Sequence, residues 1–368
     1  MIDFEPYEVT TYRLDGEYLD NRRPSKVQFI NSLKDDLSRR DFTINSMAYN
    51  NSQGLIDYFG GAVDLKGKII RCVGDADLRF QEDALRIMRA LRFASVLGFD
   101  IDIKTKYAIF KNKGLLSNIA VERVSSELNK LIVGECACTI MIDHREVFEH
   151  FIPEINALVG FEQNHPYHCL DVWGHTLSSI SQVHNDVILK LAMLFHDIAK
   201  PKCYTENEGI GHFYGHPQHS SDMAVEILKR MKYDNNTISQ VRELVFYHDV
   251  DIKPKRSQIK RLLNKIGEDT LRQLIEVKRA DVKAQSKEYM DDRLKIIDNV
   301  VTMLDEIILQ QQCFSLKDLA VNGKDLIDIG CPQGHTIGVI LNNLIEMVID
   351  ELVENDKGKL LEVAKRMQ

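Results

Sequence analysis

Helical periodicity is the sequence feature that most constrains how this chain can fold. From residue 80 onward, apolar side chains recur at three- and four-residue intervals, and this pattern predicts one helix over 80–97, ended by a glycine. Only the first fifty residues alternate as strands do, in YEVTTYR and KVQFINSL. The chain is therefore expected to be mainly α. Further helices are expected near 104–113, 121–133 and 139–150, in a run of about six from 170 to 310, and near 316–328, 334–354 and 357–367.

Length and composition narrow the class of protein. At roughly 150 residues per domain, 368 residues predict two or three domains. A hydrophobic fraction of 44% with 28% charged residues excludes disordered and collagen-like chains. Seven cysteines without a C-x-x-C pair argue against a disulfide framework. No uncharged apolar run reaches 18 residues, and the acidic N-terminus does not resemble a signal peptide, so we expect a cytoplasmic protein without a membrane partner.

Charge is unevenly distributed along the chain. The net charge is −8, yet residues 85–130 hold nine Lys and Arg against four acids, and residues 253–287 hold eleven against four. Two such tracts are compatible with binding to phosphates of a nucleic acid. Solvated helix faces explain them equally simply.

A first group of candidate functional residues lies near residues 40 and 83. Arg39 and Arg40 are adjacent guanidinium groups suited to triphosphate oxygens, and Asp41 can accept a ribose hydroxyl. Asp83 and Arg86 are three residues apart on the expected helix, where they could present an acceptor and a forked donor to one edge of a base. An ion pair on the helix surface is the simpler alternative for these two residues.

A second group combines histidines with aspartates in the middle of the chain. His175 and His196 are 21 residues apart, too far for one helical face, so they must come from two helices that meet in a bundle. Asp197 follows His196 directly. Imidazole with carboxylate suits Mn, Ni, Fe or Mg, with positions left for water and phosphate. For any single histidine, a packed core position is the simpler alternative.

Several motifs in order carry a family resemblance. They are EVTTYR, RRDFTINSMAYN, IDYFGGAVDL, IRCVGDADLRFQEDALRIMRALRFA, VERVSSELNKLI and DLAVNGKDLIDIGCPQGHTIGVILNNLIE. In these the chain resembles class II CCA-adding tRNA nucleotidyltransferases of the bacterial type that carries an HD phosphohydrolase domain. The resemblance implies addition of CCA to tRNA 3′ ends from CTP and ATP, with Mg²⁺ for nucleotidyl transfer. It implies the remnant of an α+β, DNA polymerase beta-like head over 1–70, an all-α neck over 71–150, an all-α HD domain over 151–310 and a helical tail over 311–368.

The resemblance also assigns roles to residues. Arg39, Arg40 and Asp41 match the motif that holds triphosphate and ribose, and Asp83 with Arg86 match the pair that reads CTP and ATP. Support of the neck falls to Glu82, Glu122 and Arg123. In the HD domain the metal ligands would be His175, His196, Asp197 and Asp281, while His216 and His248 match histidines that hold a second metal.

One departure from the family pattern affects the expected activity. The glycine-rich G-G-x-x-R-D segment and the D-x-D strand, whose carboxylates hold magnesium, should lie before residue 1, and Glu8 alone matches a remaining catalytic carboxylate. Loss of two bridging carboxylates should slow phosphoryl transfer by orders of magnitude. A late start codon, a fragment, or a split gene with a complementing N-terminal fragment would explain the departure. Alternative functions are an HD phosphohydrolase as the one active site, a non-catalytic tRNA-binding fragment, and addition of CC only or A only.

Overall fold

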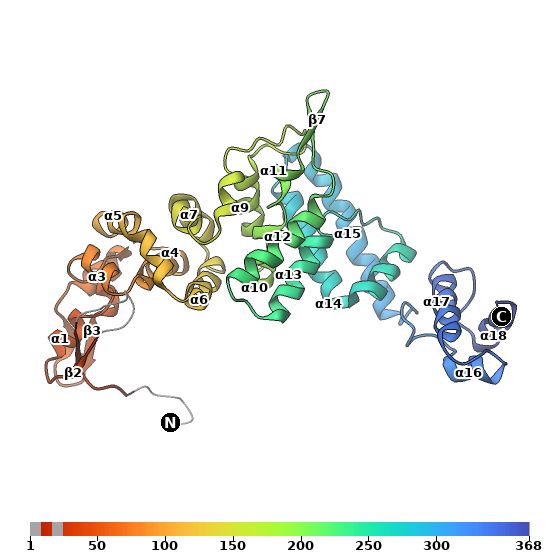
Figure 1. Ribbon diagram of the computed structural model, residues 1–368, viewed down its shortest axis with the longest axis horizontal. Coiled ribbons are helices and arrows are strands. Elements are labelled where there is room, and N and C mark those ends of the chain that lie inside the picture. Colours follow the sequence, from red (N-terminus) through yellow and green to blue (C-terminus); the bar gives the residue numbers. More distant parts are fainter. Residues whose placement is uncertain (1–8, 17–24, 368) are drawn as a thin grey trace.

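The elements follow one another along an elongated, curved molecule. The computed structural model describes residues 9–16 and 25–367. The N-terminal elements lie at one end, helices α16–α18 lie at the other, and a bundle of longer helices connects them (Figure 1). Strands are few and short, so the prediction of a mainly α chain is confirmed. No helix in the described part of the chain is long and apolar enough to cross a membrane.

The N-terminal region contains short strand pairs and small helices. β1 pairs with β2, and β3 with β4, both antiparallel, whereas β5 and β6 pair in parallel. The strand expected in KVQFINSL is present, but strands also occur beyond residue 50, where none was expected. The elements are β1 (Arg13–Asp15), β2 (Val27–Phe29), α1 (Leu33–Ser38), the 3-10 turn η1 (Thr43–Asn45), β3 (Met47–Asn50), β4 (Gly54–Asp57), α2 (Gly61–Gly67), β5 (Ile69–Ile70) and β6 (Asp100–Ile101).

The single helix predicted over 80–97 is divided in two. α3 (Ala76–Glu82) ends at Asp83, whose backbone is extended with φ −138° and ψ 102°, and α4 (Leu85–Leu97) begins two residues later. The Asp83 carboxylate accepts a hydrogen bond from the Leu85 backbone nitrogen at 3.1 Å. Aspartate can satisfy a backbone N–H outside the helical pattern, and this favours a break between helices. The prediction of one continuous helix was therefore wrong, although its glycine end is confirmed at Gly98 (φ 64°).

Short helices connect this region to the central bundle. Ser95 on α4 donates a hydrogen bond to the Leu131 carbonyl on α6 at 2.7 Å, and Gly134 lies so close to Ser95 that a side chain would not fit. Farther along, Ser125 on α6 donates to the Met231 carbonyl, and this bond fixes α6 to the bundle. The connecting elements are α5 (Ile103–Asn112), η2 (Lys113–Asn118), α6 (Val121–Ile132), α7 (Ala137–Asp143), α8 (Arg145–Phe148) and η3 (Pro153–Ala157).

The central bundle contains one projecting hairpin that the helical pattern did not predict. β7 (Thr205–Asn207) and β8 (Ile210–His212) pair antiparallel and stand out from the helices (Figure 1). Glu208 and Gly209 between them both have positive φ, as a two-residue hairpin turn of the I′ type requires. The helices are α9 (Val172–Gln182), α10 (Val187–Phe195), α11 (Lys200–Cys203), α12 (His216–Arg230), α13 (Asn235–Tyr247), α14 (Arg256–Lys283) and α15 (Lys287–Leu309).

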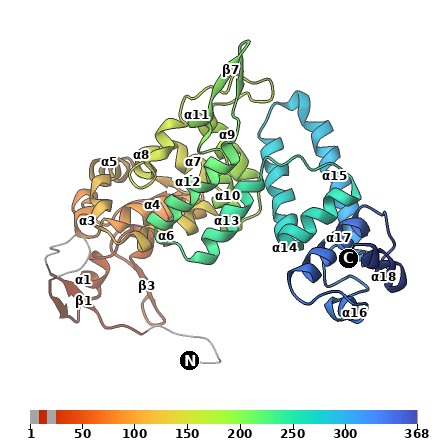
Figure 2. The ribbon, with the colours of Figure 1, turned by 45° about the vertical axis from the view of Figure 1, so that its right-hand side comes forward.

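Buried apolar side chains form two separate clusters. One extends without interruption from Phe42 to Ile307, and the other, from Cys313 to Ala364, belongs to the C-terminal helices. These helices lie beside α14 (Figure 2), where Arg261 pairs with Glu346 at 2.9 Å and with Asp350 at 2.6 Å. The expected helix at 316–328 begins only at Gly323. The C-terminal helices are α16 (Gly323–Asp328), α17 (His335–Ile349) and α18 (Lys357–Arg366).

Candidate functional site

An open cavity of about 630 Å³ brings together the first group of candidate residues. We call it the arginine cavity, because five arginines and two aspartates line it. Such an excess of cations attracts anions. The lining residues are Thr10, Thr11, Arg13, Arg39, Arg40, Asp41, Asn45, Asp83, Arg86, Arg89 and Phe93. All five residues predicted to bind nucleotide therefore lie at one cavity, although they come from two segments about forty residues apart.

Asp41 is nearly buried in the wall of this cavity and already engaged. Its carboxylate accepts hydrogen bonds from Arg89 Nε at 2.7 Å, Asn45 Nδ2 at 3.2 Å and the Phe42 backbone nitrogen at 2.9 Å. Arg89 was not singled out by the sequence analysis. Its position three residues after Arg86, on the same face of α4, is the signal that could have found it.

Arg86 and Asp83 each have a different partner. Arg86 Nη1 donates to Glu82 Oε2 at 2.7 Å, and Arg86 Nη2 donates to the Arg39 carbonyl at 2.9 Å. The Asp83 carboxylate lies 3.5 Å from Arg123 Nη2 on α6. The alternative of a simple Asp83–Arg86 ion pair on one helix therefore does not describe the structure. Both side chains are instead held at the cavity by neighbouring elements.

The other residues of this region have simpler surroundings. Glu82 contacts Arg86 and Arg123 contacts Asp83, whereas Glu122 is exposed at the start of α6. Glu8 lies outside the described residues. Three other carboxylates of this region have structural contacts: Asp75 and Asp102 cap α3 and α5, and Asp77 pairs with Lys111.

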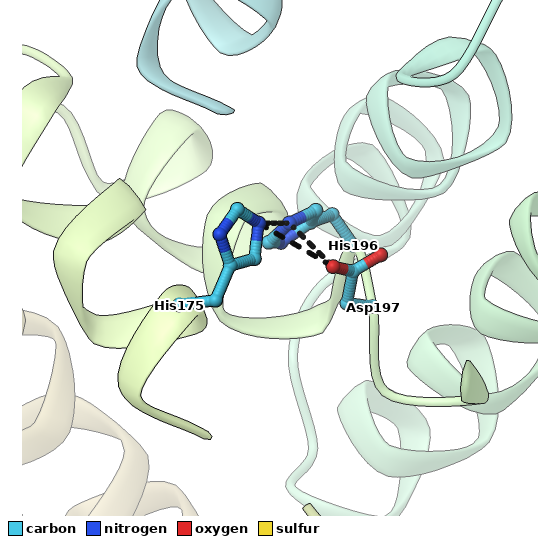
Figure 3. Close-up of side chains that lie close together, drawn as sticks. All are labelled: His175, His196 and Asp197. Atoms are coloured by element: carbon cyan, nitrogen blue, oxygen red, sulfur yellow. Dashed lines mark hydrogen bonds and ion pairs between the residues drawn. The ribbon is translucent and has the colours of Figure 1, made fainter. Parts of the chain in front are cut away.

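The second group meets in the interior of the bundle, as Figure 3 shows for three of its members. His175 comes from α9, His196 and Asp197 follow α10, and Asp281 lies on α14. His175 Nε2 is 2.9 Å from Asp281 Oδ1 and 3.3 Å from His196 Nε2. Asp197 Oδ2 lies 3.2 Å from His196 Nε2. The prediction that two helices supply these histidines is confirmed.

Asp197 also contacts a second pair of histidines through its other oxygen. Asp197 Oδ1 is 3.4 Å from His216 Nε2 and 3.7 Å from His248 Nε2, and these two nitrogens are 3.1 Å apart. His216 begins α12 and His248 follows α13. One carboxylate thus lies between two triads of possible metal ligands. We call the whole group of His175, His196, Asp197, His216, His248 and Asp281 the histidine–aspartate centre.

The four imidazoles are oriented by the backbone behind them. Each Nδ1 lies near a carbonyl oxygen to which it can donate, and each Nε2 faces the centre. In two pairs the Nε2 atoms lie 3.3 Å and 3.1 Å apart. A cation at the centre could be held by these nitrogens. The carbonyls belong to Ala284 for His175 (3.4 Å), Met193 for His196 (2.7 Å), Phe213 for His216 (2.8 Å) and Val245 for His248 (2.6 Å).

The electrostatics of the centre also favour a cation. Burial alone would raise the pKa of Asp197, but His196 and Lys200 hold it well below its usual range. Burial likewise opposes ionisation of His196, yet Asp197 and Asp281 raise the pKa of its imidazole to about 10. Lys200 Nζ lies 2.7 Å from Asp197 Oδ2. The carboxylates therefore remain charged, and a divalent cation can take the place of the proton on His196.

Comparison with known protein families gives three matches along the chain. The Poly A polymerase head domain matches residues 1–71, the probable RNA and SrmB-binding site of polymerase A matches residues 98–158, and the tRNA nucleotidyltransferase domain 2 matches residues 202–364. A CCA-adding enzyme of Bacillus subtilis is 53% identical over 133 residues, which are 36% of this chain and 34% of the relative. The match therefore spans about a third of that relative's length.

Two further comparisons extend over the whole chain. A CCA-adding enzyme of Pediococcus pentosaceus is 32% identical over 369 residues, covering 100% of this chain and 81% of the relative. The crystal structure of the Bacillus stearothermophilus CCA-adding enzyme in complex with CTP has a TM-score of 0.67 at 25% identity, covering 99% of this chain and 80% of that one. Sequence and fold thus agree over the same span. The chain belongs to the CCA-adding enzyme family.

Proposed function

We propose that the chain is a tRNA nucleotidyltransferase that adds CCA to tRNA 3′ ends from CTP and ATP. The observation that carries this proposal is the arginine cavity, in which Arg39–Asp41 and Asp83–Arg86 lie together with an excess of positive charge. The domain division predicted above is part of the proposal, with the head, neck, HD domain and tail in the cytoplasm.

The cavity residues suggest how a nucleotide is held. Arg39 and Arg40 contact the triphosphate, while Asp83 and Arg86 offer an acceptor and donors to the base edge. Asp41 binds a ribose hydroxyl only after one of its present contacts, with Arg89 or Asn45, is exchanged. The 3′ hydroxyl of tRNA then attacks the α-phosphate and pyrophosphate leaves. Mg²⁺, when bound, stabilises the charge on the attacking and leaving oxygens, and Glu8 remains a predicted catalytic carboxylate.

The two basic tracts are the candidate tRNA surfaces. Cations of both tracts are largely paired within the protein: Arg256 pairs with Glu306 in the tract at 253–287, and Arg92 pairs with Glu127 in the tract at 85–130. Bound RNA would have to displace carboxylates in either tract. We assign the phosphates of tRNA to both tracts, of which the tract at 85–130 continues from the arginine cavity.

A direct test is incorporation of labelled CTP and ATP into a tRNA that lacks its CCA end, with the purified chain and Mg²⁺. Incorporation at limiting CTP should fall in Asp83→Ala and be retained in His196→Ala, because only the first residue lies at the arginine cavity. The length of the product separates full CCA addition from addition of CC or A. Equal incorporation by Asp83→Ala and the unaltered chain would contradict the assigned site.

We also infer a second function, metal-dependent phosphohydrolysis at the histidine–aspartate centre. It is supported by the backbone-oriented imidazoles and by the shared position of Asp197. His175, His196, Asp197 and Asp281 would hold one divalent ion, and Asp197, His216 and His248 a second. A bound Mn, Ni, Fe or Mg ion would lower the pKa of a water that attacks phosphorus.

The second function is tested with a different substrate and the same variants. We expect hydrolysis of 2′,3′-cyclic AMP with Mn²⁺ or Ni²⁺ that is lost in His196→Ala and unchanged in Asp83→Ala. Equal hydrolysis by His196→Ala and the unaltered chain would exclude the centre as the catalyst.

A further inference from the structure

The histidine–aspartate centre opens into a cavity of about 390 Å³ whose outer wall contains no metal ligands. Three segments form this wall: residues 165–168 before α9, residues 211–215 from the end of β8 to the start of α12, and the start of α15 with Gln285. Their side chains are mainly aromatic and cationic. They are His165, Tyr167, His168, His212, Phe213, Tyr214, Gln285 and Arg293.

Arg293 is the arginine of this wall, and its contacts do not neutralise its positive charge. Its guanidinium lies 5.3 Å from the centre of the Tyr167 ring, and its Nη1 donates to Gln285 Oε1. Gln285 Nε2 in turn donates to Asp281 Oδ2 at 3.0 Å. Across residues 9–16 and 25–367, no carboxylate comes within 4.0 Å of the Arg293 guanidinium, whereas Arg279 on the neighbouring helix pairs with Asp298 at 2.6 Å. A neutral amide and a ring thus position the charge without neutralising it.

The charges around the cavity indicate the kind of ligand that would balance them. Asp197, Asp249 and Asp281 provide three negative charges, and Lys200 and Arg293 provide two positive ones. A single divalent ion at the centre makes the sum positive, and a second ion makes it strongly so. An anion of one or two charges, such as a phosphate ester, restores the balance.

An aromatic surface lies on the hairpin side of the same cavity. The rings of His212 and Tyr214 are stacked, with centroids 5.4 Å apart and planes 12° from parallel. Tyr214 is 75% exposed, so its ring is accessible to a flat ligand. Bases stack on such rings irrespective of their sequence.

We propose that Arg293 binds the phosphate of the substrate at the histidine–aspartate centre and that Tyr214 stacks on its base. The two residues would make the cavity prefer nucleotide phosphates to phosphates that lack a base. This assignment rests on the metal-dependent function proposed above. It makes Arg293 and Tyr214 the specificity-determining residues of that site.

The test is a set of binding titrations on the full chain loaded with Mn²⁺. Calorimetry would measure the affinity for adenosine 2′-monophosphate and for ribose 5-phosphate, after the Mn²⁺ affinity of each variant has been determined separately. Arg293→Gln should weaken both ligands about 10- to 100-fold, the effect expected for loss of a charged hydrogen bond. Tyr214→Ala should weaken only the adenosine ligand, by about tenfold. Arg279→Gln, which removes a paired arginine, is the matched control and should leave both affinities unchanged.

Each outcome separates the two proposals. A chain that binds none of Mn²⁺, Ni²⁺, Fe²⁺ and Mg²⁺ overturns the phosphohydrolase function itself. Mn²⁺ binding with unchanged phosphate affinity in Arg293→Gln overturns the role of Arg293 alone, and partial recovery in Arg293→Lys supports it. An equal loss of both ligands in Tyr214→Ala overturns the stacking role.

Discussion

The arginine cavity and the histidine–aspartate centre position their polar side chains in opposite ways. In the arginine cavity arginines are in excess, but several charged side chains are paired with one another, as Asp41 is with Arg89 and Arg86 with Glu82. In the centre the Nε2 atoms face one another and the backbone holds each ring from behind. The first site must therefore exchange contacts when it binds a ligand, whereas the second is organised before a cation arrives.

This difference should be visible in binding. Exchange of contacts costs free energy that is subtracted from affinity, so nucleotides are expected to bind the arginine cavity with moderate affinity. A preorganised set of ligands loses little on binding. Metal affinity at the centre should thus be high and sensitive to each ligand, while single changes in the cavity should act more gently.

The largest effect of a single substitution is expected at Asp197. Asp197→Asn removes the charge shared by both triads, so we expect the affinity for Mn²⁺ to fall more than about 100-fold, beyond the effect of losing an outer-shell partner. Calorimetric titration with Mn²⁺ measures it. Asp249→Asn is the matched control, because Asp249 lines the same cavity outside both triads. Similar Mn²⁺ affinities in the two variants would contradict the shared-ligand position.

In the arginine cavity, the largest effect is expected on stability. Arg89→Met leaves the nearly buried Asp41 carboxylate without its cation, and we expect the free energy of unfolding to fall by about 2 kcal/mol. Urea denaturation measures the loss. Adding Asp41→Asn should recover part of it, since the buried charge is then gone. A double variant no more stable than Arg89→Met would show that the pair is not what holds this wall.

A smaller effect is expected on nucleotide binding at the arginine cavity. Asp83→Asn keeps the size of the side chain and removes its charge, which should weaken CTP binding about tenfold. The measurement is equilibrium binding of CTP. The exposed Asp100 supplies a control, because Asp100→Asn changes the same charge outside the cavity. Equal CTP affinities of both variants would remove Asp83 from the nucleotide site.

The smallest expected effect concerns pH. Burial would raise the pKa of Asp36, but Arg39 and Arg40 lower it below its ordinary value of 3.8. The Asp36 carboxyl group therefore binds a proton less readily in the folded state than in the unfolded state. Its ionised form stabilises the folded state fully above the unfolded pKa, and this stabilisation disappears as the pH falls through the folded pKa. Urea denaturation at a series of pH values should show that the free energy of unfolding falls more on acidification in the unaltered chain than in Asp36→Asn, by about 1 kcal/mol or less. Parallel curves would exclude this linkage.

Sequence reasoning succeeded where spacing alone decides the geometry. A separation of 21 residues excludes one helical face, so the convergence of His175 and His196 from two helices followed directly. The positions of residues next to a helix break were harder to predict. The spacing of Asp83 and Arg86 fits a continuous helix, and only the contact between Asp83 and the Leu85 nitrogen shows that the chain turns there.

Contacts between distant segments lay beyond the sequence. Nothing in the spacing indicates that Arg293, on α15, reaches the cavity of His216 on α12, because that depends on how the helices pack. The β7–β8 hairpin was missed for a related reason: its strands have three residues each, too few for alternation to stand out.

The uninterrupted buried cluster from Phe42 to Ile307 has a consequence for how the protein unfolds. Both sites are built on it, so the regions that carry them are expected to unfold together rather than one after the other. A destabilising substitution in the core would lower the amount of both sites in a cell at once, since the unfolded chain is removed by proteases. A variant that loses both proposed activities together would therefore identify damage to the shared core, and a variant that loses one would identify damage to a site.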